Sequence, residues 1–228
     1  MDFTSIWIKI CGNTSLEDAL VAAEAGADAV GFVFAPSPRR VTASEVAAIV
    51  PQLPATVEKI GVFVDASLDE ISATVRACGL TGVQLHFDAP PELPELLKER
   101  LGQELRILRV VHFDAETTEQ ATDQLAPDSR IGPHIDAILV DSRTATAVGG
   151  TGVVFDWSLA ATLLFRNGET RKHLIAAGGL NPENVAEAIA TLQPWGVDVV
   201  SGVEAKPGRK DPAKVREFIA RARAAGHS

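Results

Sequence analysis

Short apolar runs rich in β-branched residues alternate with longer helical patterns along the whole chain. This order predicts parallel strands that are joined by helical crossovers. The runs are nearly continuous in apolar residues, which is typical of strands covered on both faces. Eight strands are expected, at Trp7–Ile10, Ala29–Phe34, Glu58–Val64, Gly82–Leu85, Arg106–Val111, Ala137–Val140, His173–Ala176 and Val197–Val200.

The intervening helices carry their own start and stop signals. In a capping box, a hydroxyl and a carboxylate three residues apart satisfy exposed backbone N–H groups in both directions. A capping side chain before a proline also marks a helix start, and glycine tolerates the left-handed conformation where a helix stops. The signals are capping boxes at Thr42/Glu45 and Ser67/Glu70, cap–proline pairs at Asn181/Pro182 and Asp211/Pro212, and stop glycines at Gly26 and Gly79.

Eight strand–helix units fit either a closed barrel or an open doubly wound sheet. The first expected strand is not followed by the GxGxxG fingerprint of a dinucleotide-binding sheet. We therefore predict an α/β protein with a (β/α)8 TIM-barrel fold. Residues 1–228 are expected to form one domain, because barrels of this length are commonly single domains.

Charge and segment composition narrow the class of protein. The net charge is -9, from 30 acidic and 21 basic residues, and the basic residues are dispersed, so we expect no nucleic-acid partner. The N-terminus lacks the pattern of a signal peptide, and no apolar run is long enough to span a membrane. The two cysteines, Cys11 and Cys78, have no metal-ligand spacing. A cytoplasmic monomer or homodimer with free thiols is expected.

The active site of such a barrel forms at the carboxyl ends of its strands, so reactive side chains there are candidates. Cys11 ends the first expected strand, and a thiol near positive charge can become a base, although it could equally be a small buried thiol. Asp141 follows the sixth strand, where a carboxylate is costly to bury without a function, although it could only cap a loop. Asp65 follows the third strand, and the helix start at Ser67 favours a supporting role for it.

Glycine-rich loops follow the last three expected strands. Consecutive glycines let backbone N–H groups approach an anion closely, and a helix N-terminus behind them adds a favourable dipole. Loops after strands seven and eight form the usual phosphate site of this fold, so we predict a phosphorylated small-molecule ligand. The loops contain Gly149-Gly150-Thr151-Gly152, Gly178-Gly179 and Ser201-Gly202.

Two further polar side chains near strand ends each have two interpretations. Arg39 could hold a carboxylate by a bidentate contact or be a solvated loop residue. His86 could carry protons or be a hydrogen-bonded structural imidazole. Trp7, Trp157 and Trp195 are interpreted as packing residues. The chain has no HExxH, Walker or nucleophile-elbow motif, so we expect no metal and no cofactor.

Longer motifs occur along most of the chain, although not in the fifth strand–helix unit. They are KICG at 9–12, GADAVGFVFAPSPRRV at 26–41, VQLH at 83–86, VDS at 140–142, GGTG at 149–152, FDW at 155–157, AGGLNPENV at 177–185 and VDVVSGVEAKPGRKD at 197–211. In this order they resemble the phosphoribosylanthranilate isomerases of tryptophan biosynthesis. The chain departs from the family at Phe87, where glycine is usual, and at Arg40, where an aromatic residue is common. These departures concern the edges of the substrate pocket.

The resemblance implies a cofactor-free Amadori rearrangement of N-(5-phosphoribosyl)anthranilate to 1-(2-carboxyphenylamino)-1-deoxyribulose 5-phosphate. It makes Cys11 the general base and Asp141 the general acid, and it assigns the anthranilate carboxylate to Arg39. The base must act as a thiolate and the acid as a carboxylic acid, contrary to their reference pKa order, which requires burial and nearby charge. The resemblance assigns the phosphate to Gly178, Gly179, Ser201 and Gly202, helped by Gly150 or Thr151.

Three rival functions stay open at this stage. The histidine-pathway isomerase performs the same rearrangement on a related barrel, but that family has an aspartate in place of Cys11. Indole-glycerol phosphate synthase would need a lysine and glutamate set that this loop pattern lacks. A non-catalytic barrel that binds a phosphate ligand would need the glycine loops but not the pair of Cys11 and Asp141.

Overall fold

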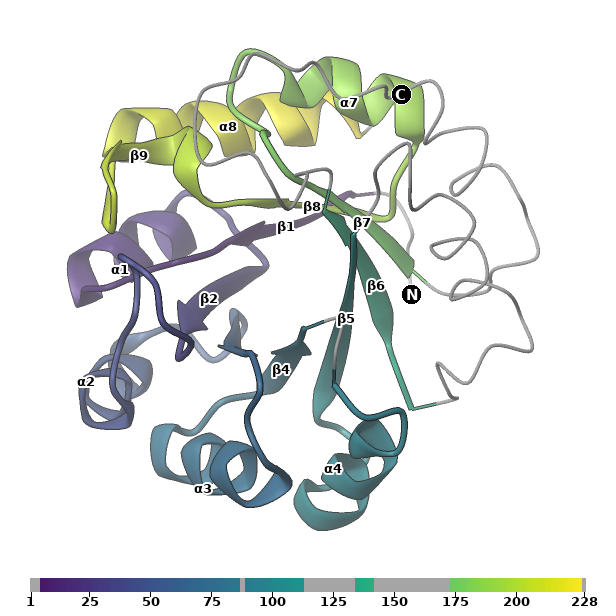
Figure 1. Cartoon of the computed structure of the whole chain (residues 1–228). Helices are drawn as coiled ribbons and strands as arrows, with labels where there is room; N and C mark the ends of the chain where they lie inside the picture. The colour runs from purple at the N-terminus through teal and green to yellow at the C-terminus, as the bar shows by residue number, and fades with distance from the viewer. Residues whose placement is uncertain (1–4, 87–88, 113–133, 142–172, 227–228) are drawn as a thin grey trace.

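Eight parallel strands close into a barrel in the order of the sequence, and helices pack around its outside (Figure 1). The computed structural model describes residues 5–86, 89–112, 134–141 and 173–226. The barrel strands are β1 (Trp7–Ile10), β2 (Ala29–Val33), β3 (Glu58–Phe63), β4 (Gly82–Leu85), β5 (Arg106–His112), β6 (Ala137–Asp141), β7 (His173–Ala177) and β8 (Gly196–Val199). The described helices are α1 (Leu16–Glu24), α2 (Ala43–Ile49), α3 (Leu68–Cys78), α4 (Leu93–Leu101), α7 (Val185–Leu192) and α8 (Pro212–Ala225), with short 3-10 helices η1 (Val50–Gln52) and η3 (Ser201–Val203).

The predicted (β/α)8 fold is confirmed, and each predicted strand differs from the observed one by at most one residue at either end. The barrel closes where β1 pairs with β8, with Lys9 opposite Asp198 and Ile10 opposite Val199. A short antiparallel hairpin of β9 (Glu204–Lys206) and β10 (Arg209–Lys210) follows β8 and was not predicted. Its strands are too short to give an alternating pattern that sequence reasoning detects.

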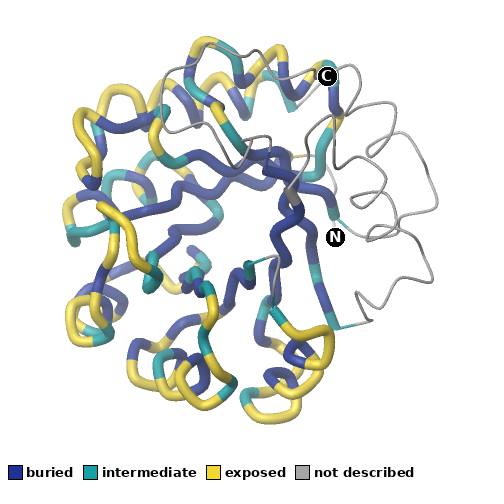
Figure 2. The backbone as a smooth tube through the Cα atoms, viewed as in Figure 1, coloured by how far each residue is buried: buried dark blue, intermediate teal, exposed yellow. Residues whose placement is uncertain are grey.

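The core has two layers. The larger one lies between the strands and the inward faces of the helices. Figure 2 shows that the strands are buried and that the helices around them are exposed on their outer faces. A smaller cluster includes Trp7, Ile60 and Leu108. Trp7 stacks on Trp195 with ring centroids 5.2 Å apart, which confirms their predicted packing role. Trp157 lies outside the described residues.

Most of the predicted helix signals are confirmed. Both capping boxes form, Asp211 caps α8, and Gly79 ends α3 in the left-handed conformation with a φ of 68°. The prediction at Asn181 was wrong, because α7 begins only at Val185. Asn181 accepts hydrogen bonds from the backbone N–H groups of Glu183 and Asn184 instead, and so stabilises the turn before the helix. No helix in the described part of the chain is long and apolar enough to cross a membrane.

Candidate active site

A small pocket at the carboxyl ends of β6, β7 and β8 brings together four of the predicted site residues. Asp141 lines this pocket with Gly178, Gly179 and Ser201, and the buried Asp198 of β8 also lines it. The residues come from three separate βα units, and they meet because parallel strands of a barrel all end at the same face. A carboxyl group and two glycine-containing loops therefore face one cavity.

The loop after β7 has a backbone that requires glycine. Gly178 and Gly179 have φ values of 84° and 66°, a region that other residues adopt at a cost. The amide of Asn184 donates a hydrogen bond to the Gly179 carbonyl (3.1 Å), and the Asn181 backbone N–H donates to the Asn184 side chain (2.9 Å). These bonds hold the loop in a fixed shape just before the N-terminus of α7, where the helix dipole favours an anion.

The loop after β8 packs directly against the loop after β7. Gly202 has no side chain at the point where the carbonyl of Leu180 approaches it, and a Cβ atom there would overlap that oxygen. Ser201 begins η3 and is exposed at the pocket. The structure thus places Gly178, Gly179, Ser201 and Gly202 together. Gly150 and Thr151 lie outside the described residues.

Cys11 is held at the end of β1 with its thiol packed on β2. The residue is 3% exposed, and its backbone N–H donates to the carbonyl of Val199 (2.9 Å). A Cβ atom added to Gly31 would lie 2.5 Å from the Cys11 sulfur, so the missing side chain of Gly31 leaves the space that the thiol uses. Asn13 fixes the following loop by donating from its amide to the carbonyls of Ile10 (2.8 Å) and Gly31 (3.2 Å).

Two residues before Cys11, Lys9 points into the barrel, because alternate residues of a strand share a face. Its ammonium donates to Asp198 (2.7 Å) and to Gln84 (2.9 Å), and its side chain is fully buried. Burial lowers the pKa of Lys9, but the negative charges of Asp198 and Cys11 outweigh burial and raise it overall. Lys9 is therefore a protonated cation below the thiol.

Burial and charge act on Cys11 in opposite directions. Burial raises the pKa of the Cys11 thiol and Asp198 raises it further, whereas Lys9 and Lys210 lower it. The net pKa is above the ordinary value of a cysteine. The thiol is thus mainly protonated near neutral pH, and the two lysines reduce the cost of ionising it.

Arg39 lies across the top of β1. Its guanidinium donates from Nε and Nη2 to the two carboxylate oxygens of Glu204 (2.8 and 2.7 Å). Gly12 has a φ of 75°, and a Cβ atom there would lie 2.8 Å from Cδ of Arg39, so the arginine stem passes directly over the residue after Cys11. The structure brings Arg39 to the same end of the barrel as Cys11 and holds it by a buried carboxylate.

The two remaining candidates lie elsewhere on the rim. Asp65 and His86 line a different pocket with Ser67, between the ends of β3 and β4. Asp65 has a left-handed backbone with a φ of 53°, which turns the chain into α3, while Ser67 supplies the cap of that helix. This geometry supports the structural interpretation of Asp65.

Comparisons with known proteins identify the family. A family model described as N-(5'phosphoribosyl)anthranilate (PRA) isomerase matches residues 8–221. The chain is 44% identical over 215 residues to an N-(5'-phosphoribosyl)anthranilate isomerase of Pelobacter propionicus, a match that covers 94% of each chain. The chain belongs to this isomerase family.

Solved structures of the isomerase family agree with the fold. The phosphoribosyl anthranilate isomerase of Thermotoga maritima is 38% identical and has a TM-score of 0.82, covering 96% of this chain and 99% of that one. Another isomerase, solved with reduced 1-(o-carboxyphenylamino)-1-deoxyribulose 5-phosphate, is 37% identical with a TM-score of 0.79 and the same coverage. The resemblance seen in the sequence motifs is therefore confirmed.

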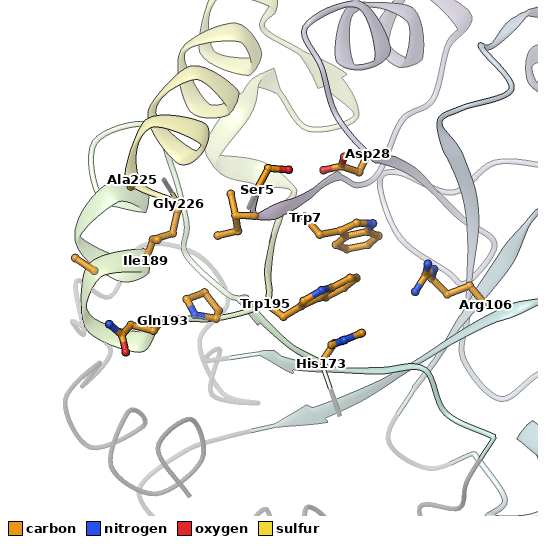
Figure 3. Close-up of a pocket in the computed structure, with 13 residues that line it drawn as sticks. Ser5, Trp7, Asp28, Arg106, His173, Ile189, Gln193, Trp195, Ala225 and Gly226 are labelled. Carbon is orange, nitrogen blue, oxygen red and sulfur yellow. The ribbon is translucent and has the colours of Figure 1, made fainter. Parts of the chain in front are cut away.

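A much larger cavity of this isomerase lies at the opposite end of the barrel, where the strands begin. It has a volume of about 910 Å³ and is lined by the stacked rings of Trp7, Trp195 and His173, with Arg106 beside them (Figure 3). The amino-terminal face of such barrels serves stability rather than catalysis. The smaller pocket, which Asp141 and the glycine-containing loops line, is therefore the candidate active site.

Sequence reasoning missed the buried charges of this isomerase site. Lys9, Asp198, Glu204 and Lys210 are each at most 8% exposed. Two of them interrupt strands that are otherwise apolar, and a charged residue in such a strand is rarely buried without a partner, so that signal was present. Glu204 and Lys210 gave no such signal, because they lie in a loop segment whose hairpin appears only in the structure.

Proposed function

We propose that this isomerase converts N-(5-phosphoribosyl)anthranilate to 1-(2-carboxyphenylamino)-1-deoxyribulose 5-phosphate, with Cys11 as general base and Asp141 as general acid. The observation that carries the proposal is the placement of Asp141 in one pocket with the two glycine-containing loops. Asp198 lines the same pocket and binds Lys9, the residue that underlies Cys11. The acid and the base therefore approach a ligand in this pocket from different strands.

The reaction requires two proton transfers on opposite sides of the sugar. Asp141 in its acid form gives a proton to the ring oxygen, and the C1–O bond breaks as the nitrogen lone pair forms an iminium. The positive iminium makes the proton on C2 acidic, and the thiolate of Cys11 removes it, which leaves an enolamine that becomes the ketone. Each step needs only one positioned acid or base.

The two ends of the substrate are assigned to opposite sides of the pocket. The phosphate is held by backbone N–H groups at Gly178, Gly179, Ser201 and Gly202, whose loops pack together before α7 and at η3. Arg39 holds the anthranilate carboxylate, because its ion pair with Glu204 occupies Nε and Nη2, which leaves Nη1 without a contact to the residues that the structure describes. Gly150 and Thr151 are proposed to help with the phosphate.

The partner and the location are proposed from the same features. A phosphorylated small molecule is the ligand, and the protein acts in the cytoplasm as a monomer or homodimer. These statements rest on the glycine loops, on the absence of a spanning helix in the described residues and on the family.

The test is the loss of anthranilate fluorescence when the purified protein meets freshly generated phosphoribosylanthranilate, with a chelator present and no cofactor added. Rapid decay that needs the protein supports the proposal. An intact fold without decay would contradict it, and turnover of the histidine-pathway substrate in parallel would then identify the rival isomerase.

A further inference from the structure

Lys210 is a buried lysine outside the barrel strands. Its side chain is 1% exposed, on the second strand of the β9–β10 hairpin. Lysines are rarely buried to this degree without a partner that needs their charge. Its ammonium donates to the carbonyl of Val200 (2.9 Å) and lies 3.5 Å from Glu204.

The anchor of Lys210 is next to Cys11 in the barrel. The Cys11 backbone N–H donates to Val199, and the carbonyl that holds Lys210 belongs to the following residue, Val200. The side chain of Val200 contacts the position of Gly12, the residue after Cys11. Lys210 and Cys11 are therefore both anchored to the carboxyl end of β8.

Among the described residues, the charged side chains that contact one another near Cys11 include more positive than negative groups. Lys9 is neutralised by Asp198 at 2.7 Å. Glu204 is shared, because both its oxygens bind Arg39 at 2.8 Å or less while Lys210 lies 3.5 Å away. Among the described residues, these contacts thus link three positive side chains to two carboxylates. A thiolate at Cys11 would add a third negative group to this cluster.

We propose that Lys210 is a positioning residue that supports the ionised form of Cys11 by holding a buried positive charge beside the thiol. Among the described residues, the charged groups that act on Cys11 are Lys9 from β1, Asp198 from β8 and Lys210 from β10, while β2 presents Gly31, which has no charge. Lys9 acts on the thiol as well as on Asp198, and Lys210 adds a second positive charge, whose carboxylate neighbour Glu204 is 3.5 Å away and already bound to Arg39.

The mutual effects on ionisation agree with this assignment. Burial lowers the pKa of Lys210, and the charges of Glu204 and Cys11 raise it. Burial raises the pKa of Cys11, and Lys9 and Lys210 lower it. Each of the two groups therefore makes the charged form of the other less costly, as opposite charges in a dry site do. The importance of this for turnover rests on the proposed role of Cys11 as the base.

The experiment compares Lys210→Gln with Lys210→Arg. Glutamine can still donate to the Val200 carbonyl but has no charge, whereas arginine keeps the charge. Ionisation of Cys11 is followed by ultraviolet thiolate absorbance against pH, with the Cys11→Ser protein as blank, and kcat/KM is measured over the same pH range. Lys214→Gln is the control, because Lys214 donates only to the backbone carbonyl of Glu204 (3.3 Å), from the exposed start of α8.

We expect Lys210→Gln to raise the ionisation midpoint of Cys11 by about one pH unit or more, since one opposite charge close by shifts a pKa by about 1–3 units. The pH at which kcat/KM rises should increase by the same amount, so that kcat/KM falls about tenfold at pH values below the midpoint. Lys210→Arg and Lys214→Gln stay near the parent protein. Lys210→Met serves as a second uncharged variant if Lys210→Gln unfolds.

An unchanged thiol midpoint in the uncharged variants would overturn the proposal, even if activity fell, because the lysine would then only support the hairpin. A loss confined to KM with an unmoved pH limb would overturn it too. Full activity of Cys11→Ala would remove the base from the proposed function, while the absorbance titration would still decide whether Lys210 supports the thiolate.

Discussion

At the scale of single residues, the environment of Cys11 decides how the proposed base works. Burial disfavours the thiolate, and buried lysines on two sides favour it. A thiol left in an apolar barrel without these lysines would be still harder to ionise. The same packing that raises the pKa also fixes the position of the sulfur over Gly31.

Removing either proposed catalytic group should abolish most turnover. Cys11→Ala and Asp141→Asn are each expected to lower kcat by about 10²–10⁴-fold, because acid–base catalysis contributes that much. Binding of a product analogue should change little, since the phosphate and carboxylate contacts remain. Steady-state kinetics and calorimetric titration measure the two effects.

Cys78→Ala is the matched control for the thiol. Cys78 is also buried, but it lies on α3 with its thiol directed to the carbonyl of Ala43 (3.3 Å). This variant should keep kcat. Near-normal kinetics in Asp141→Asn would instead point to another carboxyl group as the acid.

Gly31→Ala should displace the base without unfolding the barrel. The new methyl group would lie 2.5 Å from the sulfur of Cys11, and a shift of about 1 Å in a reacting group can cost about 10²-fold in rate. We expect kcat to fall at least about tenfold. Gly61→Ala on β3 is the control, because the atoms nearest to its methyl group belong to the side chains of Leu80 and Phe63. Equal kinetics of the two variants would show that Gly31 does not position the thiol.

At the scale of elements, short connections place the reactive groups. The β9–β10 hairpin carries Glu204 and Lys210 back over β1, where they meet Arg39 and the end of β8. By contrast, the capping boxes of α2 and α3 only fix where those helices begin. Local sequence therefore fixes where helices begin, whereas tertiary contacts fix where the charged groups of the hairpin lie.

Loss of a helix cap should therefore affect stability but not catalysis. Ser67→Ala removes the hydroxyl that accepts from the Glu70 backbone N–H and is expected to lower the free energy of unfolding by about 1 kcal/mol. Ser67→Asp, which restores a capping oxygen, should have a free energy of unfolding within a few tenths of a kcal/mol of the parent value. Urea unfolding measures both, and an unchanged stability in Ser67→Ala would contradict the role of the cap.

At the scale of the whole molecule, a buried ion pair joins the first strand to the last. Lys9 on β1 and Asp198 on β8 face each other in register, and they are 2.7 Å apart inside the closed barrel. The helix at the C-terminus adds a second tie, since Arg223 of α8 bonds to Asp28, next to β2 (2.8 Å). Closure of the barrel is thus tied to charges next to the active site.

Lys9→Met should destabilise the barrel as a whole. It leaves Asp198 buried without its cation, and breaking a buried pair on one side costs about 3–5 kcal/mol. The double variant Lys9→Met with Asp198→Asn removes both charges and should recover part of this loss. Chemical unfolding at neutral pH measures the difference. If Lys9→Met alone were as stable as the parent, the ion pair would not stabilise the closure of the barrel between β1 and β8.

The strands, several helix boundaries and the end of the barrel that carries the candidate site residues could be predicted from the sequence alone. Strand periodicity and capping patterns are local, so they can be seen in neighbouring residues, as the boundaries of β1 and the caps at Thr42 and Ser67 show. Position at a strand end was enough to select Cys11 and Asp141 as candidates. Asn181 was misplaced because its side chain stabilises a turn, a choice that local sequence leaves open.

The charged groups around Cys11 and Asp141 could be found only from the tertiary structure. Lys9 and Asp198 are 189 residues apart, and Arg39 and Glu204 are 165 residues apart, so no local pattern relates them. They meet because the closed barrel brings β1 against β8 and the hairpin folds back over both. The ionisation of a buried thiol depends on distances to such groups, and those distances exist only after the chain has closed.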